Sequence, residues 1–488
     1  MPANIPLDTL CNCAFKQVWQ WLYNLINRHP GFRNTQRYYL IENLLMKFRD
    51  QLLRFTFKEK AEEVSTLDKC SFIKLLADDK TKVLDFTNSA KWLFEDVMSL
   101  YYALEFANVV NLYRFGVRCS VTLTESEFAQ SINVNASFYD TLRSMVQLTS
   151  LTLTGIANGT ILKILARNCE QLKYLNVQDS KSICDNCVVK LILTESIDID
   201  MYSVDDLLNM KVASTPCTSK LTHVGLSGTS VTLKSAVILL QYIPNLLSFE
   251  GQVNEGSTFE AISIMAKNCS YDESFVLKLT HLCDSQLPPE KASLISRVCP
   301  DLMYVDISAS WINSLYNLQT ISHLSLDVDF GHYINDIYNY LYGYGEYLTT
   351  LNLKKSNSSP LDLEWLINFT PNLEHLNAYL ECSNTDLNAY WVKLKTASIV
   401  IKSAECFIVF CKFAPLIEEL DLKFKTKVSY DDDDWHSIND TLVVSVLVDG
   451  GLLKLKKLII GECDLGIDSV EYIMSHCYNL AYIGNLGW

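Results

Sequence analysis

Apolar residues recur along the chain in a short pattern, L-x-x-L-x-L, in which polar residues separate the leucine-type positions. Because successive residues of a β-strand point to opposite faces, this alternation predicts a short strand with one buried face. Clear copies begin at Leu148, Leu172, Leu221, Leu302, Ile321, Leu348, Ile417 and Leu455. Weaker copies begin at Leu246, Leu373 and Leu480, and degenerate ones are predicted at Leu84–Phe86, Ile197–Ile199 and Leu277–Leu279.

The spacing of these copies predicts a helix between one strand and the next. Leu148 and Leu172 are 24 residues apart, and the 49 residues from Leu172 to Leu221 leave room for one degenerate repeat. Apolar residues at helical i, i+3, i+4 spacing precede several strands, as in Ile161, Leu162 and Leu165. One strand and one helix cannot bury their apolar faces alone, so we expect the repeats to stack on one another.

One copy is complete: LKKLIIGECDL, from Leu455 to Leu465, fits L-x-x-L-x-L-x-x-C-x-L at every required position. This pattern resembles the leucine-rich repeat, in its ribonuclease-inhibitor-like and cysteine-containing subclasses. The resemblance implies an α/β fold, a leucine-rich-repeat solenoid with a curved parallel sheet inside and helices outside. It covers residues 141–488, and residues 71–140 are either degenerate repeats or a connector.

Residues 1–70 carry no repeat motif and form a separate helical segment in this interpretation. Their apolar stripes predict two amphipathic helices, from about Pro6 to Asn27 and from about Asn34 to Phe55. The segment could dock a partner or cap the open end of the repeats.

The first predicted helix begins with Pro6, Leu7, Cys11 and Phe15 at a spacing that resembles the elongin-binding box of cullin–RING ubiquitin-ligase receptors. The resemblance implies that Leu7 enters a pocket of elongin C while Cys11 and Phe15 line the same helix face. Leucine-rich-repeat adaptors of the Zyg-eleven-like group share this order of box and repeats. No Leu-Pro-x-Pro cullin-selecting box follows near residues 30–60, so the choice of cullin stays open.

Two alternatives to this box remain open. The same helix could merely cap the first repeat and hide its apolar end. Residues 5–10, IPLDTL, also resemble the Leu-Pro-x-x-x-Leu opening of an F-box, although the later Cys-x-x-Trp part of that motif is not evident.

Charge narrows the class of partner. The chain of 488 residues has 41 Lys and Arg against 56 Asp and Glu, a formal net charge of −15. That balance argues against nucleic-acid binding, which needs clustered basic residues, and favours a protein target with a basic segment.

No apolar run approaches the ~20 residues of a membrane-spanning helix. Because a secretory signal is not evident, we expect the 16 cysteines to be reduced thiols in the cytoplasm or nucleus.

Candidate chemistry is sparse, and we expect no catalytic residues, no cofactor and no metal. The sequence contains no P-loop, H-E-x-x-H or G-x-S-x-G motif. Cys184 and Cys187 form a C-x-x-C pair without further zinc ligands at suitable spacing, which favours core cysteines. An acidic run, Asp431–Asp434, is expected in an insertion loop. His223, His323 and His375 lie between the first and second apolar positions of their strands, so they are candidates for partner contact on the concave face.

The sequence therefore favours a non-catalytic protein-interaction module, the substrate-recognition subunit of a cullin–RING ubiquitin ligase that binds elongin C with elongin B. The alternative is a ligase-independent leucine-rich-repeat scaffold or inhibitor whose N-terminal helices only cap the solenoid.

Overall fold

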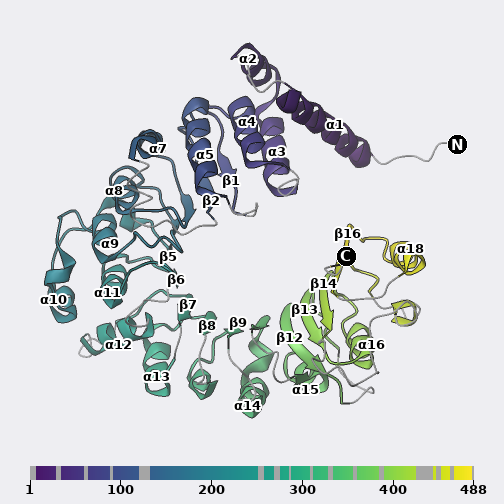
Figure 1. Ribbon diagram of the computed structural model, residues 1–488. Helices are drawn as coiled ribbons and strands as arrows, with labels where there is room; N and C mark the ends of the chain where they lie inside the picture. The colour runs from purple at the N-terminus through teal and green to yellow at the C-terminus, as the bar shows by residue number, and fades with distance from the viewer. Residues whose placement is uncertain are drawn as a thin grey trace, which may run out of the picture. The chain divides into compact units, whose positions relative to one another are not determined.

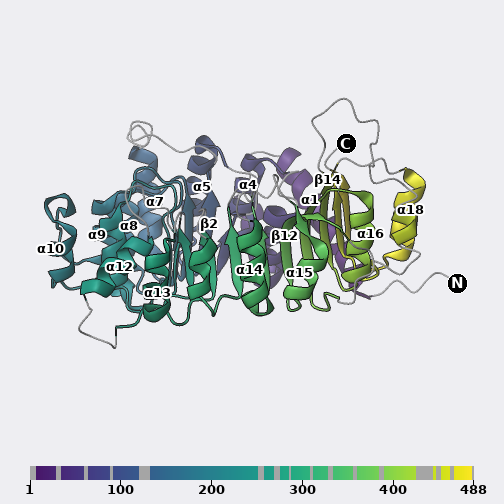
Figure 2. The same cartoon turned by 90° about the horizontal axis from the view of Figure 1, so that it is seen from below.

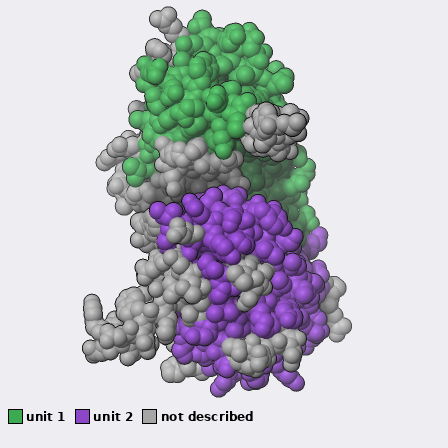
Figure 3. Space-filling model, turned by 90° about the vertical axis from the view of Figure 1, so that its right-hand side faces the viewer, with its two compact units in different colours: residues 1–268 green, residues 269–488 purple. Residues whose placement is uncertain are grey.

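The computed structural model describes residues 7–28, 34–59, 64–87, 92–119, 132–250, 258–268, 275–284, 287–307, 312–327, 334–354, 360–383, 390–424, 443–446, 452–461 and 466–485. Side chains at positions 7–12 and at a few other places within these ranges are not described. The chain divides into unit 1, Met1–Asn268, and unit 2, Cys269–Trp488 (Figure 3). Each unit is described by itself.

Helical segments precede the first strand of unit 1: α1 (Leu7–Arg28), α2 (Asn34–Asn43), α3 (Met46–Arg54), a π-helical turn (Phe55–Glu59) and α4 (Thr66–Leu76). The sequence predicts one helix over residues 34–55, yet the chain breaks at Leu45, where φ is −54° and ψ is 137°. The Asn43 side-chain amide donates to the Tyr39 carbonyl at 2.7 Å. This bond satisfies a carbonyl of the last turn and helps to end α2.

The second half of α1 packs into unit 1. Trp19, Leu22 and Ile26 are buried, and the Trp19 indole Nε1 donates to Thr56 Oγ1 at 2.9 Å. These residues recur at a spacing of three or four, which places them on one helix face. That face of α1 is therefore part of the apolar core of the helical segment.

Unit 1 contains a parallel sheet whose strands follow the chain order. The strands are β1 (Val83–Asp85), β2 (Arg114–Arg118), β3 (Ser150–Thr154), β4 (Tyr174–Asn176), β5 (His223–Gly225) and β6 (Ser248–Glu250). The main helices between and after them are α5 (Phe94–Ala107), α7 (Ile132–Ser144), α8 (Gly159–Asn168), α9 (Asp185–Ile192), α10 (Val204–Asn209), α11 (Leu233–Tyr242) and α12 (Thr258–Asn268). β1 pairs in register with β2, and β2 pairs with β3, so repeat-type strands already occur within residues 71–140.

Unit 2 repeats the same arrangement, with helices on one face of its parallel sheet (Figures 1 and 2). Its strands are β7 (His281–Asp284), β8 (Tyr304–Ile307), β9 (His323–Leu326), β10 (Thr350–Leu353), β11 (Leu361–Asp362), β12 (His375–Glu381), β13 (Thr396–Ile401), β14 (Glu419–Phe424), β15 (Lys457–Ile460) and β16 (Tyr482–Asn485). Its main helices are α13 (Pro289–Val298), α14 (Ile334–Tyr344), α15 (Leu363–Phe369), α16 (Ala404–Phe413) and α18 (Ile467–His476). The short β11 pairs only with the far end of β12.

The leucine pattern fills the space between sheet and helices. In β3, for example, Leu148, Leu151 and Leu153 are all fully buried, and the corresponding residues of β10 are buried as well. Stacked strand–helix units with such a leucine core are the architecture of a leucine-rich-repeat solenoid. The predicted fold class is thereby confirmed.

Two of the strands predicted for degenerate repeats, at Ile197–Ile199 and at Leu277–Leu279, are not found at those positions. Ile199 begins a short 3₁₀ helix, Ile199–Met201, rather than a strand, so the long segment between β4 and β5 contains no additional repeat strand. The strand predicted at Leu277–Leu279 lies further along the chain, because β7 covers His281–Asp284 with Leu282 buried, and the buried Leu279 precedes it at the first apolar position. The third apolar position of that copy is occupied by Asp284, which weakens the pattern.

Trp391 fills the position of a repeat helix between β12 and β13. Only 21 residues separate His375 from Thr396 in the paired register, and the described residues of this connection contain no helix. The Trp391 indole is fully buried, and its Nε1 donates to the Thr370 carbonyl at 3.0 Å. A single large side chain therefore closes the core where the repeat is short.

We expect Cys169 and Cys299 to resist alkylation by iodoacetamide at pH 8 in the folded protein. Both side chains are buried, and burial raises the pKa of each thiol to about 12. Because the thiolate is the reactive form, a thiol with this pKa stays protonated and inert at pH 8. The exposed Cys13 of α1 should be labelled first, as mass spectrometry of the labelled peptides would show. Rapid native-state labelling of Cys169 would contradict this expectation.

Candidate functional site

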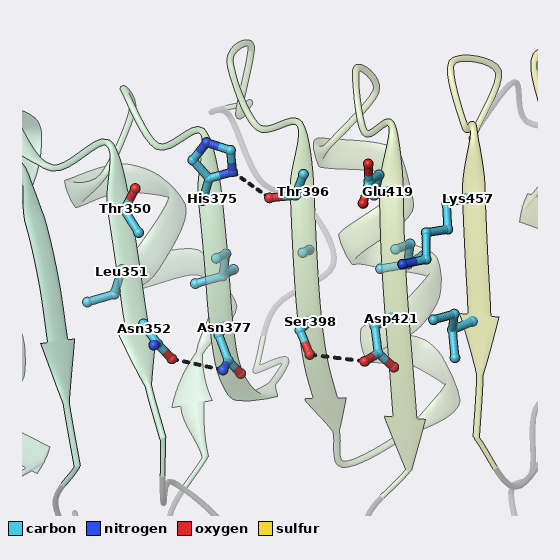
Figure 4. Close-up of a pocket in the computed structure, with 14 residues that line it drawn as sticks. Thr350, Leu351, Asn352, His375, Asn377, Thr396, Ser398, Glu419, Asp421 and Lys457 are labelled. Carbon is cyan, nitrogen blue, oxygen red and sulfur yellow. Dashed lines mark hydrogen bonds between the residues drawn. The ribbon is translucent and has the colours of Figure 1, made fainter. Parts of the chain in front are cut away.

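The sheet of unit 2 presents a polar surface on the face away from its helices (Figure 4). Strands β10 and β12–β15 surround an open depression of about 340 Å³ on this surface. Its polar lining consists of Thr350, Asn352, His375, Asn377, Thr396, Ser398, Glu419, Asp421 and Lys457. This depression, called the unit 2 hollow below, is the candidate functional site.

Strand register builds the hollow as two rows of side chains. Residues directly opposite one another on neighbouring strands form the first row: Thr350, His375, Thr396, Glu419 and Lys457. The second row lies two residues further along each strand: Asn352, Asn377, Ser398 and Asp421. The apolar residues between the rows point to the core, because side chains alternate along a strand.

Hydrogen bonds link the members of the second row. Asn377 Nδ2 donates to Asn352 Oδ1 at 2.8 Å, and Asn352 Nδ2 donates to Ser325 Oγ at 3.2 Å (Figure 4). At the other end, Ser398 Oγ lies 3.4 Å from Asp421 Oδ2. Asp421 Oδ1 is buried and accepts no hydrogen bond from the described residues. The row is thus ordered by hydrogen bonds at both of its ends.

Charged residues that immediately precede these strands alternate in sign from one strand to the next. One residue before the first row, Lys395 pairs with Glu374 at 2.6 Å and Lys456 pairs with Glu418 at 2.6 Å. The hydrogen bond and charge of Lys395 lower the pKa of the exposed Glu374 carboxyl, which stays ionised at neutral pH. Exposed pairs of this kind contribute little stability. They leave a balanced surface, so the overall acidity of the chain is not concentrated around this hollow.

The three histidines predicted for the concave face occupy the first outward position of their strands. His375 is exposed and lines the unit 2 hollow, where its Nδ1 lies 2.5 Å from Thr396 Oγ1. His323 is separated from it by β10, and His223 belongs to unit 1. Burial lowers the pKa of His223 and of His323 below the ordinary value, which favours neutral rings at pH 7. The structure therefore does not gather the three into one cluster, and their role in binding stays a prediction.

A fourth histidine occupies the same position and was missed from the sequence. His281 begins β7, and its ring lies 5.3 Å from that of Tyr304, which lies 6.0 Å from that of His323. In β5, β7 and β9 the residue before the histidine is Thr or Ser, and its hydroxyl lies 2.7–2.8 Å from the histidine Nδ1. This contact fixes the ring orientation. The repeated Leu/Ile-Ser/Thr-His triplet is the sequence signal that could have revealed this recurring histidine position.

The four residues of the N-terminal box are only partly described. Pro6 lies outside the described residues, and Leu7 and Cys11 belong to α1 without described side chains. Phe15 is half-buried, and its ring lies 5.5 Å from Phe48 and 5.3 Å from Phe55. Phe15 therefore makes contacts within the chain, and docking through the box stays a prediction.

The remaining candidates yield no metal-binding cluster. Cys184 and Cys187 are free thiols with Sγ atoms 3.6 Å apart at the start of α9. Within the described ranges, no group of three or more His, Cys, Asp or Glu side chains could hold a metal ion. No helix among the described residues is long and apolar enough to cross a membrane. The acidic run Asp431–Asp434 lies outside the described residues.

Comparison with known proteins gives only remote likenesses. No family model matches the chain, and no curated protein matches it. A solved structure of the Rad7 and Elc1 complex in yeast matches with 13% identity and a TM-score of 0.43, covering 96% of each chain. A leucine-rich-repeat protein of Leptospira interrogans matches with 12% identity and a TM-score of 0.34, over 70% of this chain and 91% of that one. The fold assignment therefore rests on the strands and buried leucines described above.

Proposed function

We propose that this protein is a non-catalytic interaction subunit that presents a protein target on its sheet faces. The observation that carries this proposal is the ordered row of outward polar side chains in unit 2, which lines an open surface rather than an enclosed cavity. Enclosed, mostly apolar pockets are typical of small-molecule sites, whereas an open face with alternating charges suits a macromolecular partner.

We further propose that α1 docks elongin C, which would make the protein a substrate receptor of a cullin–RING ubiquitin ligase. Helix α1 starts at Leu7, so Leu7 and Cys11 occupy its first two turns, one helical turn apart. The packed residues Trp19, Leu22 and Ile26 belong to later turns and anchor the helix. A helix with an anchored second half can offer its first turns to a groove on a partner.

The remaining parts of this proposal follow from the ligase role. A cullin would join through the elongin B–elongin C pair, and the complex would act in the cytoplasm or nucleus. The protein would carry out no reaction itself; it would raise the effective concentration of its target near the ubiquitin-conjugating enzyme.

Co-expression with elongin B and elongin C tests the docking. We expect the wild-type chain to co-elute with both elongins on size-exclusion chromatography, and a Leu7→Ala, Cys11→Ala double variant to elute without them. Both substitutions remove side chains that would fill the partner's groove, and such anchors dominate interface energy.

A matched control is a Lys16→Ala, Gln20→Ala double variant. Both residues are exposed on the same helix, so this variant should co-elute like the wild type. Failure of the wild type to co-elute, or retention of the elongins by the Leu7, Cys11 variant, would reject the docking.

One observation favours the alternative in which the helices only cap the repeats. The Arg37 guanidinium donates to the carbonyls of Lys74, Ala77 and Ala107 at 3.0–3.3 Å. These bonds attach α2 to the ends of α4 and α5. If the wild type does not bind the elongins, this capping role and a ligase-independent scaffold become the better explanation.

A further inference from the structure

The outward sheet face of unit 1 contains a second depression, called the unit 1 hollow below. It has a volume of about 600 Å³ and is lined only by polar residues: Thr87, Arg114, Arg118, Ser150, Thr152, Thr154, Tyr174, Asn176 and Gln178. None of these residues is acidic, although the chain has a net charge of −15. The lining instead offers guanidinium, hydroxyl and amide donors.

Strand β2 supplies the centre of the unit 1 hollow. Arg114, Gly116 and Arg118 alternate along the strand and so share its outward face. A side chain at Gly116 would collide with its neighbours, because a Cβ there would lie 2.9 Å from both Asp85 Oδ1 and Thr87 Cγ2. The absence of a side chain at Gly116 therefore makes room for the Asp85 carboxylate and the Thr87 side chain above the strand.

The two arginines differ in how they are held. Arg114 Nη2 pairs with Asp85 Oδ2 at 2.7 Å, and Thr87 Oγ1 donates to Asp85 Oδ1 at 2.6 Å. Asp85 thus orients Arg114 and neutralises part of its charge. Arg118 is exposed and forms no ion pair with any described residue. One guanidinium is therefore positioned by a carboxylate, and the other has no such ion pair among the described residues.

The local charge is opposite to that of the whole chain. Lys82 and Lys173, both exposed, lie one residue before β1 and β4. With Arg114 and Arg118 they give four basic residues on β1–β4 or beside them, against Asp85 and against Glu250 of β6, which accepts a hydrogen bond from Gln178 at 3.2 Å. Such a surface attracts an anionic partner although the chain as a whole is acidic.

We propose that the unit 1 hollow binds an acidic segment of a protein partner, with one phosphate or carboxylate group at the Arg118 guanidinium. A guanidinium binds such oxygens through two parallel hydrogen bonds, and the hydroxyls of Ser150 and Thr152 add donors from the next strand. This inference rests on the proposed function only in that the partner is a protein; it does not need the elongin contact. It replaces the expectation of a basic target for this face.

A nucleic acid fits the same surface less well. Binding of a phosphate backbone depends on many Lys and Arg contacts along the strand, and single-stranded forms also need aromatic stacking platforms. The lining contains two arginines and one aromatic residue, Tyr174. A short peptide with one or two anionic groups matches this number of basic residues.

The test uses the purified full-length chain, without elongins, and three degenerate nine-residue peptide libraries. The libraries carry phosphoserine, aspartate or serine at the fixed central position. We expect the phosphoserine and aspartate libraries to be retained at least about tenfold better than the serine library, because charge-assisted hydrogen bonds to a guanidinium are about twice as strong as neutral ones. The ratio of phosphoserine to aspartate retention distinguishes the two anionic sources.

Variants assign the effect to the unit 1 hollow. Arg118→Gln should remove the preference for anionic peptides, and Arg118→Lys should restore part of it, since lysine keeps the charge without the planar fork. Arg167→Gln is the matched control, because Arg167 is exposed on α8 outside the hollow. Arg118 is exposed, so its variants should melt at the wild-type temperature.

Three results would overturn the inference. These are equal retention of all three libraries, no retention of any library, and a preference that survives Arg118→Gln. Tighter, Arg118-dependent binding of a twelve-nucleotide single-stranded RNA would replace the peptide with a different class of partner. Because no elongin is present, a negative result here leaves the docking proposal for α1 unaffected.

Discussion

Replacement of Trp391 by alanine is expected to lower the free energy of unfolding by about 3–5 kcal/mol, the usual cost of deleting a buried tryptophan side chain. The Trp391 indole is fully buried and packs against Phe410, with ring centroids 6.1 Å apart. It also donates to the Thr370 carbonyl at the end of α15. Because Trp391 is among the largest fully buried side chains of the described residues, its loss leaves a large cavity in the core. Urea unfolding followed by circular dichroism measures the change.

Two further variants separate the roles of Trp391. Trp391→Phe keeps most of the apolar volume but removes one of two donors to the Thr370 carbonyl, which still accepts from the Leu373 N–H, at a cost of about 0.5–1.5 kcal/mol. Trp365→Ala is the control, because Trp365 is 47% exposed. A Trp391→Ala protein no less stable than the Trp365→Ala protein would show that the loop does not depend on this side chain.

The second large effect is expected for Arg49→Ala, which should cost about 3–5 kcal/mol because it leaves the Asp78 carboxylate buried without its counter-charge. The side chains are 4% and 8% exposed, and Arg49 Nη2 lies 2.9 Å from Asp78 Oδ2. Arg49 Nη1 also donates to the Leu76 carbonyl at 2.8 Å. The substitution therefore breaks the connection between α3 and the segment that leads into β1. Thermal and urea unfolding measure the loss.

Two further variants test the contribution of the Arg49–Asp78 ion pair: a control that should keep the stability and a double variant that should restore it. Arg54→Ala removes an exposed arginine from the same helix and should change stability by less than about 0.5 kcal/mol. A double variant, Arg49→Met with Asp78→Leu, should recover most of the loss, because an apolar pair of similar volume avoids desolvation of two charges. The buried Arg49 Nε, which has no described partner, adds to that cost in the wild type. A double variant as unstable as Arg49→Ala would mean that the loss arises from packing rather than charge.

The fold was predictable because buried leucines repeat with the period of strand and helix. Strands β2 and β13 were missed although both fit the pattern, with Phe115 and Val117 in β2 and Ala397 and Ile399 in β13 at the leucine positions. All four are buried. A search for leucine alone therefore understates the repeats, since any apolar residue of suitable size can face the helices.

The candidate sites could be predicted less completely from the sequence, because they depend on contacts between strands and helices that the sequence pattern does not specify. The outward position of His375 follows from alternation along one strand, but its contact with Thr396 depends on the register of the next strand. The contacts of Phe15 could not be foreseen, because an apolar helix stripe looks the same whether it packs on its own chain or on a partner. The unit 1 hollow depends on Gly116, whose importance appears only when Asp85 and Thr87 are placed above it.

The segment between β4 and β5 is a suitable place to insert a tag. Tyr174 and His223 pair directly although 49 residues separate them, and α10 lies on the helical side, away from the sheet (Figure 1). Within this segment Met201 is 81% exposed. Exposed connections of this kind tolerate inserted sequence well. A fluorescent or affinity tag inserted beside Met201 would leave the outward sheet face of unit 1 uncovered, so target capture could be followed without altering either end of the chain.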